Sequence, residues 1–112
     1  MGQPESRTRS TLALKVSSLR FTQAARAELI EAHDWYEAQA PGLGSRFLSA
    51  IDETAERILA GPLRFPIALK TVRRARVKVF PYALFYVVDS DELLVIACFH
   101  SRRAPRIWQS RA

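Results

Sequence analysis

The side chains best suited to chemistry lie in the second half of the chain, where cations recur at even spacing. Over Val72–Val79 an extended backbone would place Arg74, Arg76 and Lys78 on one face and Ala75, Val77 and Val79 on the other. Neighbouring cations on that face would stand about 6 to 7 Å apart. A row of this kind can bind successive phosphates of RNA or DNA, or an acidic protein.

A second basic group follows in the tail, which contains His100, Arg102, Arg103, Arg106 and Trp108. Residues 63–112 carry 10 Lys/Arg against 3 Asp/Glu, whereas residues 1–62 carry 7 against 8, so the net charge of +6 is concentrated in one half. His100 can exchange a proton near neutral pH, and Trp108 can stack on a base or pin the tail to the core. We interpret both groups as a binding surface; the alternative is a solvated face that serves solubility.

Other kinds of site have weaker support in the sequence. Cys98 lies within an apolar run, which favours a buried small side chain over a nucleophile. Two histidines and one cysteine without short spacing predict no metal site, and no glycine-rich loop precedes a helix to hold a nucleotide, so no cofactor is expected. The lone cysteine and the lack of a membrane-length apolar run predict a cytoplasmic protein without a membrane partner.

Helical patterns dominate the first half. We expect a strand over Leu14–Phe21, a helix capped by Thr22 that runs to about Gln39, and a turn at residues 40–42. A second amphipathic helix then runs from Leu43 to Gly61-Pro62, and the short connection predicts an antiparallel pair. Trp35 and Tyr36 are expected to be packing residues of the first helix.

Strand patterns dominate the second half. After a loop over residues 63–71 we expect strands over Val72–Val79, Tyr82–Val88 and Leu93–Phe99, the last two apolar on both faces and therefore central. The predicted fold class is α+β: an N-terminal strand, an antiparallel helical hairpin, and an antiparallel three-strand meander that completes one sheet. Residues 14–112 would form this single domain, after a disordered leader of residues 1–13.

Several short motifs, in this order, resemble the RelE/ParE toxins of bacterial type II toxin–antitoxin systems over about residues 14–111. The motifs are Phe21-Thr-x-x-Ala25, Trp35-Tyr36, Pro41-Gly42-Leu43-Gly44-x-Arg46-Phe47-Leu48, Val72-Arg73-Arg74, Phe80-Pro81-Tyr82 with Tyr86, and His100-x-Arg102-Arg103-x-Pro105-x-x-Trp108. The resemblance implies the fold just described. It also implies a cognate acidic antitoxin whose extended arm wraps the basic toxin.

The resemblance leaves the activity open between two branches. RelE-like members cleave messenger RNA in the ribosome, and Arg74, Arg76 and Arg102 match their strand and tail cations. Ala83, however, stands where the next strand would begin with an arginine, and Trp108 replaces a tail tyrosine. Arginine is a poor base and indole exchanges no useful proton, so only His100 remains as a candidate general acid or base.

The leading hypothesis is therefore a ParE-like toxin that inhibits DNA gyrase without hydrolysing a substrate. Its binding residues would be Arg74, Arg76, Lys78, Arg102, Arg103, Arg106 and Trp108. The first alternative is a ribosome-dependent RNase acting on messenger RNA, with Arg74, Arg76, His100 and Arg102 as its candidate catalytic residues. The second is a non-toxic homologue that only binds or regulates an antitoxin.

Overall fold

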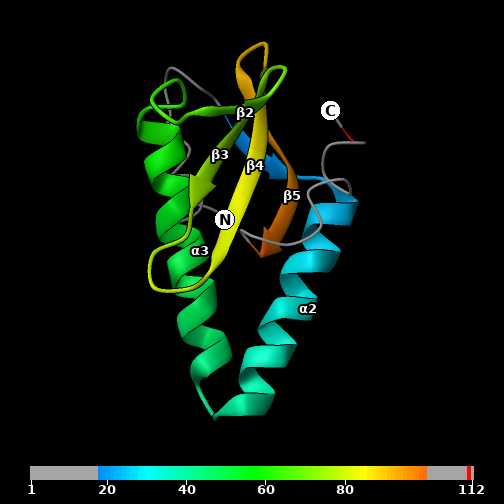
Figure 1. Ribbon diagram of the computed structural model, residues 1–112, viewed down its shortest axis with the longest axis vertical. Coiled ribbons are helices and arrows are strands. Elements are labelled where there is room, and N and C mark those ends of the chain that lie inside the picture. Colours follow the sequence, from blue (N-terminus) through cyan, green and yellow to red (C-terminus); the bar gives the residue numbers. More distant parts are fainter. Residues whose placement is uncertain (1–17, 101–110, 112) are drawn as a thin grey trace, which may run out of the picture.

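The computed structural model of the 112-residue chain describes residues 18–100 and 111, which form two helices and a five-stranded sheet (Figure 1). In chain order the elements are β1 Ser18–Phe21, α2 Gln23–Gln39, α3 Leu43–Ala60, β2 Ile67–Leu69, β3 Val72–Arg76, β4 Tyr82–Asp89 and β5 Glu92–His100. The expected leader, the first residues of the expected N-terminal strand, and tail residues 101–110 lie outside this description.

The sheet has the order β1-β5-β4-β3-β2, and its pairs are antiparallel except for β1, which runs parallel to β5. The two helices form an antiparallel hairpin, joined at the lower end of Figure 1 and spread apart at the level of the sheet. The predicted α+β class and element order are confirmed. In the described part of the chain, neither helix is long and apolar enough to cross a membrane.

Side-chain hydrogen bonds fix where the two helices begin. The Thr22 hydroxyl accepts from the Ala25 amide at 3.1 Å, as the sequence predicted for the cap of α2. At the helix-to-helix turn, the Glu37 carboxylate accepts from the amides of Gly42 and Gly44, both at 2.9 Å. Gly42 has φ +85°, which glycine adopts without strain. One side chain of α2 thus supplies the missing cap of α3 and closes the hairpin.

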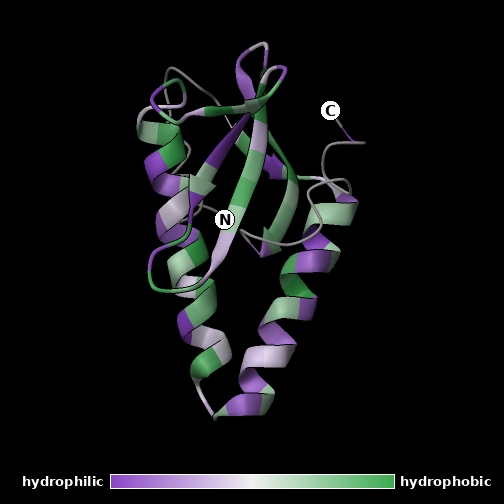
Figure 2. Cartoon of the chain, viewed as in Figure 1, coloured by the Kyte–Doolittle hydropathy of each residue, from purple (hydrophilic) through white to green (hydrophobic). Residues whose placement is uncertain are grey.

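Apolar side chains of both helices cover one face of the sheet. Phe47, Ile51 and Ile58 of α3 pack with small residues of α2 against Leu84 and Tyr86 of β4, and all of them are buried. A second cluster lies on the opposite face and includes Val72, Ala83, Phe85 and Ala97. The central strands are accordingly apolar over most of their length (Figure 2). The prediction that β4 and β5 are central and covered is confirmed.

Two expected boundaries were wrong. The region expected to be a loop contains the edge strand β2, which begins directly after Pro66. A proline can precede an edge strand, because no neighbouring strand needs its missing N–H. The Pro66 carbonyl still accepts from the Arg74 amide of β3, at 3.0 Å. Strand β3 ends at Arg76 instead of Val79. Val79 has φ +76° and an 88% exposed side chain, so it does not continue the apolar face.

Candidate target-binding surface

Arg74 and Arg76 share the face of the sheet that lies opposite the helices. In the β3–β4 register Arg74 pairs with Phe85 and Arg76 with Ala83, and both partners belong to the second apolar cluster. Paired residues project on the same side of a sheet, so the two guanidinium groups stand over that cluster. Within the described residues neither guanidinium has a hydrogen bond or an ion pair. They are therefore available to a partner.

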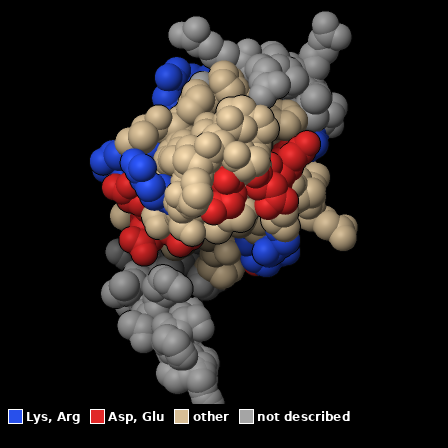
Figure 3. Space-filling view, turned by 90° about the horizontal axis from the view of Figure 1, so that it is seen from below, with Lys and Arg blue, Asp and Glu red and all other residues tan. Residues whose placement is uncertain are grey.

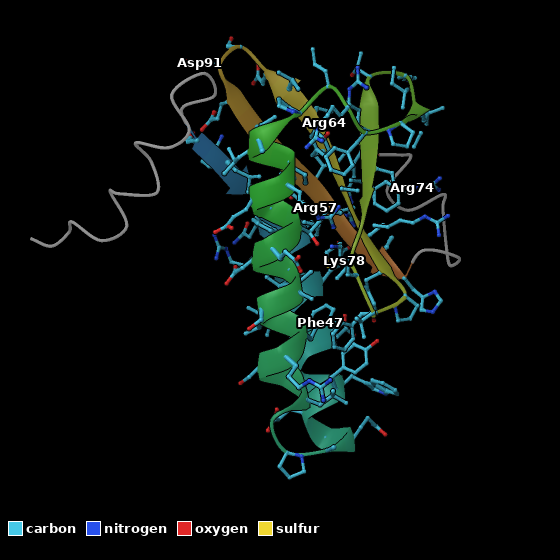
Figure 4. All side chains as sticks on the ribbon, turned by 90° about the vertical axis from the view of Figure 1, so that its left-hand side faces the viewer. Phe47, Arg57, Arg64, Arg74, Lys78 and Asp91 are labelled. Carbon is cyan, nitrogen blue, oxygen red and sulfur yellow. The ribbon has the colours of Figure 1, made fainter. Side chains whose placement is uncertain are left out.

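Neighbouring arginines have structural roles. Arg73 points to the other side and donates to the carbonyls of Leu63 (3.3 Å) and Phe65 (2.7 Å), which holds the segment before β2. Arg57 of α3 donates to the Arg76 carbonyl at 2.9 Å. Figure 4 shows Arg57 on the side of the sheet that faces α3 and Arg74 on the far side. Only part of the basic cluster is thus free to bind.

The sequence predicted that Lys78 continues the row of Arg74 and Arg76, but the structure does not show this. Because β3 ends at Arg76, the alternation of faces does not continue to Lys78. The Lys78 ammonium instead lies 3.6 Å from the Glu53 carboxylate of α3. The predicted three-cation row is a pair, Arg74 and Arg76.

His100 lies at the end of β5, on the face opposite to the two arginines. It pairs in register with Tyr82, and the two rings meet edge-on at 5.8 Å between centroids. Tyr82 packs in the helix-side cluster, whereas Ala83, the partner of Arg76, lies on the other side. The structure brings Arg74 and Arg76 together but not His100 with them, so these three candidates do not form one catalytic set. Arg102, Arg103, Arg106 and Trp108 lie outside the described residues.

Cys98 is buried, as the sequence predicted, and burial raises the pKa of its thiol to about 12. The thiol therefore stays protonated at neutral pH, which makes it a poor nucleophile. Among residues 18–100 and 111, no three His, Cys, Asp or Glu side chains come close enough to hold a metal ion.

A cavity of about 630 Å³ lies between α2 and the end of β5, and no pattern in the sequence led us to expect it. Its lining includes Glu28, Glu31 and Trp35. The sequence predicted that Trp35 is a packing residue, and this was wrong, because its side chain is 58% exposed. The lining residue Glu28 accepts two hydrogen bonds from Arg111, at 2.8 and 3.2 Å, and Arg111 also donates to the Ile96 carbonyl. The signal in the sequence was the spacing Glu28, Glu31, Trp35, which puts all three on one helix face.

Comparison with known families and solved structures agrees with this fold. The family described as "ParE toxin of type II toxin-antitoxin system, parDE" matches residues 19–105. The chain belongs to this ParE toxin family. A solved structure titled "Chromosomal ParDE TA system from P. aeruginosa" is similar to this ParE-family chain, with 19% identity and a TM-score of 0.68. The match covers 77% of this chain and 97% of the other. No curated protein matches this chain.

Proposed function

We propose that this ParE-family toxin inhibits DNA gyrase by binding and is neutralised by a cognate antitoxin. The observation that supports inhibition by binding is the isolation of Arg74 and Arg76. Their neighbours across the β3–β4 pair are Phe85 and Ala83, and neither side chain can take or give a proton. Two cations without an acid or base among their described strand neighbours can bind phosphate or carboxylate groups, but they cannot complete an acid–base reaction by themselves.

The direct test measures gyrase activity on relaxed plasmid DNA. We expect the purified toxin at micromolar concentration to block supercoiling and to accumulate cleaved DNA. A toxin that leaves gyrase unaffected at that concentration would refute the proposal.

Charge reversal tests the two arginines. The double variant R74E/R76E is expected to weaken inhibition by at least about tenfold, because it replaces the attraction to a negative target with repulsion. The matched control is R26E/R46E, which changes the net charge equally at two exposed arginines on the helices. Equal losses in both variants would mean that net charge matters and the position of the arginines does not.

A ribosome-dependent RNase is the second candidate, and the same two arginines favour it because unpaired guanidinium groups can stabilise the charge on a phosphate in the transition state. New cuts in messenger RNA on translating ribosomes, without any effect on gyrase, would support this candidate. Expression of the chain without an antitoxin distinguishes both toxins from a non-toxic regulatory homologue, since only a toxin arrests growth.

A further inference from the structure

The cavity beside α2 combines aromatic rings with carboxylates. Its wall includes Trp35 and Tyr36 of α2, Pro81 and Tyr82 at the start of β4, and His100 at the end of β5. A volume of about 630 Å³ is within the usual range of ligand pockets in proteins. Neither Arg74 nor Arg76 is among the lining residues, so the cavity is separate from the basic surface described above.

Ring contacts hold the aromatic wall in place. The ring centroids of Trp35 and Tyr36 lie 5.1 Å apart, those of Tyr36 and Tyr82 6.1 Å, and those of Tyr82 and His100 5.8 Å. Tyr36 also contacts the partly buried Phe80 at 4.9 Å and the buried Phe47 at 5.1 Å, measured between ring centroids. The wall is therefore anchored in the core at Tyr36, while Trp35 presents an exposed ring. The face of such a ring attracts cations.

The same wall already binds one cation of the chain. The Arg111 guanidinium pairs with Glu28 and lies 5.7 Å from the centre of the Phe99 ring, so it is held by a carboxylate and an aromatic face together. Glu31 and Trp35, one turn apart on α2, repeat this combination. Within the described residues the Glu31 carboxylate has no hydrogen bond or ion pair, although the chain carries a net charge of +6.

The lower end of the molecule differs in charge from the basic strand. Viewed from below, Figure 3 shows carboxylates in two groups beside a broad uncharged area, with Lys and Arg at the margins. A cationic group is attracted to such a surface, and a strongly acidic segment is repelled.

We propose that this cavity binds an arginine or lysine side chain of the cognate antitoxin, with the cation between Glu31 and the face of Trp35. The proposal rests on the toxin–antitoxin function of the family. The overall negative charge of an acidic antitoxin attracts it to the basic toxin but does not fix which antitoxin residue meets which toxin residue. One basic antitoxin residue bound in an acidic aromatic pocket fixes that alignment. The gyrase surface is assigned to the opposite face of the sheet, so the antitoxin is the partner left for this cavity.

The first experiment titrates the full-length toxin with Nα-acetyl-arginine methylamide and follows the indole N–H signal of Trp35 by NMR, assigned with Trp35→Phe. The neutral citrulline analogue is the matched ligand. We expect saturable binding of the arginine compound only, weakened about fivefold by Glu31→Gln and unchanged by Glu56→Gln, an exposed carboxylate on α3. Equal binding of the two ligands, or equal effects of the two variants, would overturn the cation site.

The second experiment measures the affinity of folded Glu31→Arg toxin for its cognate antitoxin. We expect a loss of at least about tenfold, with inhibition of gyrase kept. Unchanged antitoxin affinity would overturn the proposed occupant. If the unmodified toxin does not inhibit gyrase, the target assignment fails, whereas the arginine titration and the antitoxin affinity still decide the cavity.

Discussion

The ion pair between Glu28 and Arg111 is expected to be the strongest electrostatic contact of the described structure. The Glu28 carboxylate accepts two hydrogen bonds from Arg111, at 2.8 and 3.2 Å, and one from the Cys98 amide at 3.0 Å. Only 15% of the Glu28 side chain and 26% of the Arg111 side chain are exposed, so water replaces these contacts poorly. Arg111 also donates to the Ile96 carbonyl, which lies one residue beyond the part of β5 that pairs with β1.

The magnitude follows from these contacts. A hydrogen bond to a charged group contributes about 1.5 to 3 kcal/mol. We expect Glu28→Gln and Arg111→Gln each to lower the free energy of unfolding by about 2 to 3 kcal/mol. The double variant should lose less than the sum, which gives a coupling energy of about 1 to 2 kcal/mol.

Urea unfolding of the unmodified protein, the two single variants and the double variant, followed by circular dichroism, measures this coupling energy. The pair Arg20–Glu92 is the control, because its contact is similarly short at 2.7 Å but its side chains are 59% and 31% exposed. Its coupling energy should be clearly smaller than that of Glu28–Arg111, because water screens an exposed ion pair. Equal coupling in the two pairs would refute the reasoning that burial sets the strength of these contacts.

Three further changes test other parts of the fold. Tyr86→Phe should lower the free energy of unfolding by about 1 to 3 kcal/mol in urea titrations, because the buried hydroxyl donates to the Pro62 carbonyl at 2.5 Å. Val79→Gly should raise it by about 1 kcal/mol, since φ +76° strains a β-branched residue; an unchanged midpoint would contradict this. The amides of Gly42 and Gly44 lower the pKa of Glu37, so its contribution to stability is complete above the unfolded-state pKa and is lost as pH falls through the lower folded-state pKa. Acid unfolding of Glu37→Gln should lack this step.

The sequence predicted the elements that depend on local patterns. The cap at Thr22, the turn at Pro41-Gly42 and the continuous apolar runs of β4 and β5 are signals between near neighbours, and the structure follows them. The position of the Lys78 side chain was predicted wrongly, because it depends on where β3 ends and on Glu53 of α3. A period-two rule has no information about such a partner.

In the candidate site, too, the features that depend on local pattern were predicted and those that depend on strand pairing were not. Arg74 and Arg76 share a face as the strand period predicted. The separation of His100 from them could not be predicted, because it follows from the pairing of β5 with β4 and of β4 with β3. The cavity was missed for a similar reason, since its walls come from α2, the start of β4 and the end of β5, and no short motif spans them.

The parallel pairing of β1 with β5 ties completion of the fold to completion of the chain. Ser18 pairs with Glu92 and Phe21 with Val95, so every partner of the first strand is translated more than seventy residues later. Pairs so distant in sequence form slowly, because a long loop must close before any contact stabilises it. During synthesis the helical hairpin can form while β1 still lacks its neighbour, and the sheet closes only when β5 has left the ribosome. A chain that ends between residues 61 and 91 therefore contains both helices but lacks β5, and it cannot assemble the toxin fold.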